Sequence, residues 1–129
     1  MKPGASKHKG NAFENYCKKA IQNAIGHELI LCRKTFGSGS QPDDKGDLVV
    51  GKYMIECKFH KKITEGKLKD WWRKIFLESN YDNKIPVLIY KENRKGINVR
   101  TFEFGKTPII TINLTFIEFL RKLNEEYKK

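Results

Sequence analysis

The sequence predicts an α/β domain with a central mixed β-sheet flanked by helices. Residues 11–25 and 66–79 carry apolar side chains at the helical repeat of 3.6 residues. Residues 46–62 are predicted to form a β-hairpin, because a Gly-Lys pair fits a two-residue turn between alternating strands. Residues 85–90 form a short apolar run typical of a buried strand. With a strand before the hairpin, the predicted order is α-β-β-β-α-β, followed by further strands and a helix.

The first predicted helix presents one wide apolar stripe, formed by Ala12, Phe13, Tyr16, Cys17, Ala20, Ile21, Ala24 and Ile25. Glu14 lies at the edge of this stripe. Two interpretations of Glu14 stay open. It is either a functional carboxylate that leans toward the sheet, or the closing residue of a capping box that begins at Asn11.

A strand over residues 27–36 and a Gly/Ser-rich loop over residues 37–46 lead into the hairpin. The hairpin turn sets the register, which places Val50 opposite Tyr53 and Asp47 opposite Glu56. Strand alternation then gives one face suited to a core, made of Leu48, Val50, Tyr53, Ile55, Cys57 and Phe59. The other face carries Asp47, Val49, Met54, Glu56, Lys58 and His60.

Two carboxylates, Asp47 and Glu56, therefore face each other across the predicted ladder. Like charges directly opposite each other are destabilising unless something compensates them. A divalent cation would do so. Oxygen ligands suit Mg²⁺, for which Mn²⁺ is an acceptable substitute. Lys58 shares this face and places an ammonium beside the metal's water, a set of groups suited to phosphodiester hydrolysis.

Two further aspartates, Asp43 and Asp44, compete with Asp47 for the role of metal ligand. Asp47 is preferred because it begins a strand and faces Glu56. The other two lie between a proline and a glycine, in irregular backbone.

The motif Asp47, then Glu56-Cys57-Lys58, resembles the D…ExK signature of the PD-(D/E)xK nuclease superfamily. Upstream, residues 9–14 place a Lys-Gly pair before Glu14, and Ser38-Gly39-Ser40 follows. This order resembles the archaeal-type Holliday junction resolvases and related viral nucleases over roughly residues 8–90. The short gap between Asp47 and Glu56, and the Trp71-Trp72 pair, depart from the archaeal pattern.

The resemblance implies a restriction-endonuclease-like core and a Mg²⁺-dependent, structure-specific DNA endonuclease, with a Holliday junction as the expected substrate. It implies Glu14, Asp47 and Glu56 as metal ligands and Lys58 as a catalytic residue. Paired symmetric nicks in a junction need two sites related by a two-fold axis, so a homodimer is expected. Two alternatives stay open: the same chemistry on flaps, mismatches or duplex, or a non-catalytic basic module that binds nucleic acid.

Charge also indicates a nucleic-acid partner, since 26 Lys and Arg residues give a formal net charge of +11. The expected contacts with DNA phosphates are Lys9, Arg33, Ser38, Ser40, Lys61 and Lys62. Residues 1–9 are expected to form a flexible basic arm of a single nuclease domain that spans residues 1–129.

Three cysteines without metal-ligand spacing favour reduced core residues over a disulfide framework or a zinc site. No long apolar run or signal peptide is found, so no membrane is expected as a partner. The expected location is the cytoplasm, or the host cytoplasm if the protein is viral.

The second helix carries a stripe of Leu68, Trp71, Trp72, Ile75 and Phe76. The two tryptophans of this stripe are expected in the core, with base stacking or a dimer contact as the alternative. Strands are predicted over residues 97–104 and 108–114, the latter at an edge. A final helix is predicted from Thr115, whose spacing to Glu118 matches a capping box.

Overall fold

The computed structural model describes residues 3–26, 30–32, 48–102 and 111–127. Its elements are α1 (Pro3–Ile25), β1 (Ile30–Cys32), β2 (Leu48–Val50), β3 (Tyr53–His60), α2 (Glu65–Tyr81), β4 (Ile85–Glu92), β5 (Ile97–Phe102), β6 (Thr111–Thr115) and α3 (Phe116–Tyr127). The strands form one sheet in the order β1-β2-β3-β4-β5-β6. Strands β3 and β4 are parallel and the other neighbours are antiparallel, which confirms the predicted mixed α/β sheet.

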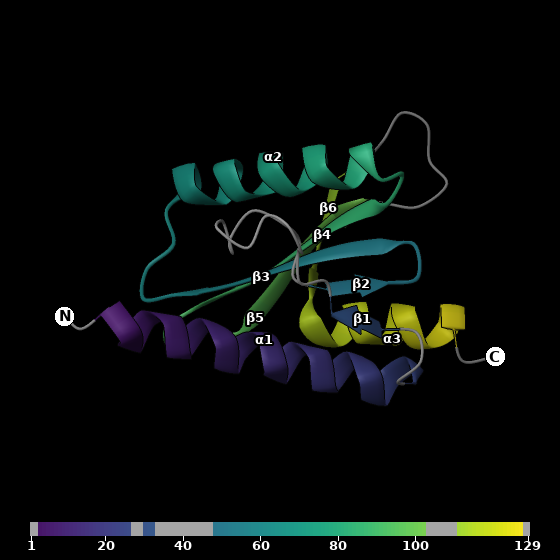
Figure 1. Cartoon of the computed structure of the whole chain (residues 1–129), viewed down its shortest axis with the longest axis horizontal. Coiled ribbons are helices and arrows are strands. Elements are labelled where there is room, and N and C mark those ends of the chain that lie inside the picture. The colour runs from purple at the N-terminus through teal and green to yellow at the C-terminus, as the bar shows by residue number, and fades with distance from the viewer. Residues whose placement is uncertain (1–2, 27–29, 33–47, 103–110, 128–129) are drawn as a thin grey trace.

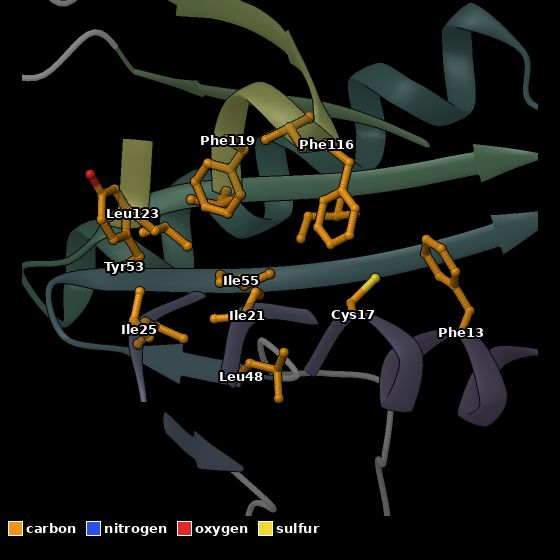
Figure 2. Close-up of a cluster of buried hydrophobic side chains, with 14 residues drawn as sticks. Phe13, Cys17, Ile21, Ile25, Leu48, Tyr53, Ile55, Phe116, Phe119 and Leu123 are labelled. Atoms are coloured by element: carbon orange, nitrogen blue, oxygen red, sulfur yellow. The ribbon is translucent and has the colours of Figure 1, made fainter. Parts of the chain in front are cut away.

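Helices cover both faces of the sheet (Figure 1), with α1 and α3 on one side and α2 on the other. The larger core lies under α1 and α3, where Phe13, Cys17 and Ile21 meet Leu48, Ile55 and Phe119, as Figure 2 shows. The smaller core lies under α2, where Leu68 and Ile75 pack against Met54 and Leu88. The two faces of β3 are therefore both covered, and each carries its own set of side chains.

The hairpin has the predicted register, with Val50 opposite Tyr53 and Leu48 opposite Ile55. Gly51 adopts φ +53, as the first position of a Gly-X turn requires. The predicted pair of Asp47 and Glu56 is not tested, because Asp47 lies outside the described residues.

We expect Gly51→Ala to destabilise the protein. An alanine would need a left-handed backbone, and its Cβ would lie 2.9 Å from Cζ of Tyr127. The expected loss in free energy of unfolding is roughly 1–3 kcal/mol. The matched control is Gly96→Ala in the β4–β5 turn, where an added Cβ meets nothing within 4 Å. Equal urea midpoints for the two variants would contradict the assignment of this turn.

Helix α1 begins at Pro3, eight residues before its predicted start. The expected flexible arm is therefore wrong for residues 3–9, which are helical. Proline suits the first helical position, and once a helix has nucleated on a packed segment each further residue is added at little cost. Asn11 consequently lies inside the helix, and the capping-box interpretation of Glu14 is wrong. The apolar stripe is also narrower than predicted, because Tyr16 is 58% exposed.

The starts of the other two helices agree with the sequence. Thr64 caps α2 by accepting a hydrogen bond from the Lys67 backbone N–H at 3.2 Å. At α3, the Thr115 N–H donates to Glu118 at 2.8 Å, and the Glu118 N–H donates to Thr115 Oγ1 at 3.2 Å. This reciprocal pair is the predicted capping box.

The three remaining predicted strands are confirmed only in part. Their described portions are β1, β5 and β6, and β6 forms an edge of the sheet as expected. Residues 27–29, 33–36, 103–104 and 108–110 of these predictions lie outside the described residues. Within the described part of the chain, every helix is too short or too polar to cross a lipid bilayer.

Candidate active site

The site centres on Glu56, in the middle of β3 on the side covered by α2. Its neighbours in the strand, Ile55 and Cys57, belong to the opposite core, so alternation directs Glu56 toward α2. Glu56 is only 4% exposed. Its Oε2 lies 3.3 Å from the Lys58 ammonium nitrogen. Its Oε1 is buried and has no hydrogen-bond partner among the described residues.

Burial is the main influence on the acidity of Glu56, and it raises the pKa of this carboxyl to about 7 from its ordinary 4.5. The ammonium groups of Lys58 and Lys74 act in the opposite direction, and Glu78 raises the pKa further. A carboxylate in such surroundings gains from any additional positive charge placed beside it. The ionised Glu56 carboxylate would therefore be stabilised by a cation in addition to the two lysines.

Two groups near Glu56, Lys74 and Glu78, were missed by the sequence reasoning. Both come from α2, and the Glu78 Oε1 atom is buried. Their signal was present in the sequence, because residues 71, 74 and 78 follow the same helical spacing as the apolar stripe. Charged residues at such positions face the sheet together with the apolar ones.

Lys58, the second candidate catalytic residue, lies close to Trp71. The Lys58 ammonium nitrogen lies 5.7 Å from the centroid of the Trp71 ring, and the His60 ring is 4.8 Å from the same tryptophan. A cation over an indole face is attracted electrostatically. Lys58 is therefore held between a carboxylate and an aromatic ring, which limits the positions that its ammonium group can take.

Both tryptophans are half-buried and pack against the α2-side core, as predicted for members of an apolar stripe. Trp72 makes edge contacts with Phe76 at 6.2 Å and with Phe102 at 5.9 Å between ring centroids. Trp72 therefore packs between α2 and β5.

Glu14 is half-buried on α1, next to Phe13, whose ring lies 5.4 Å from that of Phe59. It thus belongs to the helix that covers the opposite face of the sheet from Glu56. Lys61 and Lys62 are exposed directly after β3, and Lys9 lies in α1. Asp47, its rivals Asp43 and Asp44, and the predicted phosphate contacts Arg33, Ser38 and Ser40 lie outside the described residues.

Glu56 meets the chemical requirement for a divalent metal ligand. Its buried Oε1 has lone pairs that no described donor uses, and carboxylate oxygens are the ligands that Mg²⁺ prefers. No group of three His, Cys, Asp or Glu side chains that could hold a metal occurs among residues 3–26, 30–32, 48–102 and 111–127. A complete site would therefore need a further ligand. Asp47, which is predicted to lie opposite Glu56, lies outside the described residues.

The Glu-Cys-Lys triplet lies on the central strand β3, with its acidic and basic members on one face. Over residues 5–126 the chain matches the family described as "Phage putative PDDEXK endonuclease". The chain belongs to this family. Membership confirms the resemblance to PD-(D/E)xK nucleases. The assignment of Glu56 and Lys58 to the ExK motif stays a prediction.

A solved structure similar to this PDDEXK endonuclease is Hjc of Archaeoglobus fulgidus, a Holliday junction resolvase. The similarity covers 87% of this chain and 98% of that chain, with a TM-score of 0.50 and 17% sequence identity. At this identity the comparison shows a shared fold, which confirms the expected restriction-endonuclease-like core. No curated protein matches the sequence.

The raised pKa of Glu56 predicts a pH-dependent stability in the absence of divalent cations. Between pH 4.5 and about 7 the folded chain holds a proton on Glu56 that the unfolded chain releases. Stability therefore falls as the pH rises through this window, by up to about 3 kcal/mol. We expect Glu56→Gln to remove this fall. In urea unfolding with EDTA, the free energy of unfolding of the variant relative to the wild type should therefore rise between pH 5 and pH 8.

The control for this experiment is Glu125→Gln, which changes an exposed carboxylate on α3. It should follow the wild type at both pH values. A Glu56→Gln curve parallel to the wild type would show that Glu56 is not the buried titrating group.

Proposed function

We propose that this PDDEXK endonuclease is a Mg²⁺-dependent, structure-specific DNA endonuclease that hydrolyses phosphodiester bonds of Holliday junctions. The observation that carries the proposal is Glu56, a buried carboxylate with one oxygen that no described group uses and the other 3.3 Å from Lys58. The ExK motif supports the chemistry. The junction as substrate is supported by the fold shared with a Holliday junction resolvase.

The proposed metal ligands are Asp47 and Glu56, with Glu14 as a third carboxylate and Mn²⁺ as a substitute for Mg²⁺. When bound, the metal supplies positive charge for the phosphate and lowers the pKa of a water molecule. Glu14 enters this set through the resemblance to the resolvases. Its position inside α1 excludes helix capping, but α1 covers the opposite face of the sheet from Glu56, so the resemblance alone supports Glu14 as a ligand.

Lys58 orients the attacking water or neutralises the charge that develops on the phosphate. Its contacts with Glu56 and Trp71 hold the ammonium group in place before substrate arrives, so little reorganisation is needed. Lys74 contributes a second positive charge near Glu56 from α2. Together the two lysines offset the negative charge of Glu56 and Glu78 that a phosphate would otherwise meet at this face of β3.

The net charge of +11 supports binding through the DNA backbone. Lys9, Arg33, Ser38, Ser40, Lys61 and Lys62 are the proposed phosphate contacts, and such contacts position DNA by shape without reading bases. We propose a homodimer, since symmetric incision of a four-way junction needs two active sites. The proposed location is the cytoplasm, or the host cytoplasm for a viral protein.

The decisive experiment compares a four-way junction with linear duplex of the same length, each with Mg²⁺ and with EDTA. We expect paired, symmetric nicks in the junction with Mg²⁺, slower cutting of duplex, and no product with EDTA. Equal cutting of both DNAs would replace the junction by DNA in general as the substrate. Tight binding without any product in Mg²⁺ or Mn²⁺ would leave a non-catalytic binding module.

A further inference from the structure

A small pocket opens at the start of α2, beside the candidate active site. Its volume is about 220 Å³, and its walls come from the first turn of α2, from β4 and β5, and from the turn between those strands. Apolar groups from Ile63, Leu68 and the ring of Tyr90 line one part of it. Asn98, Glu92 and Lys95 add polar groups to the lining.

The strand register ties this pocket to the catalytic face of the sheet. Tyr90 is the partner of Lys58 in the parallel β3–β4 ladder, and Asn98 is the partner of Tyr90 in the β4–β5 ladder. Paired residues point to the same face, and adjacent strands lie roughly 5 Å apart. Tyr90 in the pocket wall therefore lies one strand away from Lys58, and Asn98 lies two strands away.

The charges of the pocket do not suit a phosphate. Glu92 accepts a hydrogen bond from the Ile63 N–H at 2.7 Å and forms an ion pair with Lys95, also at 2.7 Å. The ammonium of Lys95 is thus neutralised within the pocket, and Glu65 adds another carboxylate to the wall. The pocket lining carries more negative than positive charge, so it would repel an anion but not a neutral ligand.

We propose that this pocket receives an unpaired nucleobase of the DNA strand that is cut, close to the scissile phosphate. The inference rests on the proposed nuclease function and narrows its substrate to DNA with an unpaired or easily unpaired base beside the cleavage position. The pocket is smaller than the roughly 300–1,000 Å³ of pockets for drug-sized ligands, as suits one planar ring system. Taking a base out of the stack costs least where it is already unpaired, so the pocket favours distorted DNA over regular duplex.

The binding test uses the full chain in EDTA, so that no DNA is cut. Four-way junctions carry a single 2-aminopurine at successive positions around the branch point, and its fluorescence rises when the base leaves the stack. We expect a rise at one position with the wild type. Asn98→Trp, which fills the pocket from an exposed position on β5, should abolish that rise. The matched control, Asn80→Trp at an exposed position near the end of α2, should keep it.

A cleavage test with Mg²⁺ uses junctions in which one base at a time is removed. At the position that gives the fluorescence rise, loss of the base should slow the wild type about tenfold, as expected for one lost base–aromatic contact. Asn98→Trp should be slow on the intact junction and no slower on the abasic one.

Each result decides one question. No fluorescence rise with the wild type at any position, or an equal rise with Asn98→Trp, overturns the pocket even if cleavage is normal. A rise that Asn98→Trp abolishes, without cleavage of any DNA, supports the pocket and overturns the proposed nuclease function. Because the wild-type scan decides by itself, a misfolded Asn98→Trp protein does not remove the test.

Discussion

Glu56→Gln is expected to abolish Mg²⁺-dependent cleavage while the protein stays folded. The substitution preserves the shape of the side chain and removes its negative charge, which is what a metal ligand in this position must supply. We expect the rate to fall by at least about 10³-fold, the upper end of the effect of removing one electrostatic group from an active site. Single-turnover cleavage of a four-way junction measures the loss, and fluorescence anisotropy measures DNA binding, which should be retained.

Stability separates this prediction from a purely structural role. In the absence of metal, Glu56 is buried with a raised pKa, so a neutral amide costs the fold little at pH 8. Asp47→Asn should give the same loss of cleavage if Asp47 is the partner ligand, and Glu125→Gln should behave as the wild type. Unfolding of Glu56→Gln at every pH would instead indicate that Glu56 and Lys58 form a structural ion pair.

The hairpin could be predicted from the sequence because its turn admits few geometries. A two-residue turn with Gly51 in the left-handed region aligns Val50 with Tyr53, and every later pair follows from that one. The alternation of side chains then placed Glu56 and Lys58 on one face and Cys57 on the other. The structure confirms both faces, with separate cores under α1 and under α2.

The parts that could not be predicted depend on contacts between elements distant in the sequence. Lys74 and Glu78 influence Glu56 only because α2 crosses this face of β3, and a helical stripe does not reveal which strand it will cover. The pocket arises in the same way, from α2 meeting β4 and β5. The start of α1 was missed for a local reason, since a basic segment without apolar repeats gives no periodic signal even where it is helical.

Lys58→Ala should lower the cleavage rate by about 10²-fold, the cost of one lost group that stabilises the transition state. Its effect on the melting temperature should be small below pH 7, where the carboxyl of Glu56 can take up a proton when it loses its cation. Lys58→Met is the matched control for packing, because it keeps an unbranched chain against Trp71 and removes only the charge. Equal rate losses in the two variants would assign the effect to the ammonium group.

The neighbouring residue provides the opposite test of the same strand. Cys57 packs against the core under α1, so Cys57→Lys would place an unpaired ammonium among apolar side chains. We expect a marked fall in melting temperature and a loss of about 3 kcal/mol or more in the free energy of unfolding. A Lys58→Ala protein that unfolds, beside a Cys57→Lys protein that is merely slow, would mean that the two faces of β3 are exchanged. The assignment of Glu56 to the active site would then fail with it, because Glu56 lies two residues from Lys58 in the same strand and shares its face.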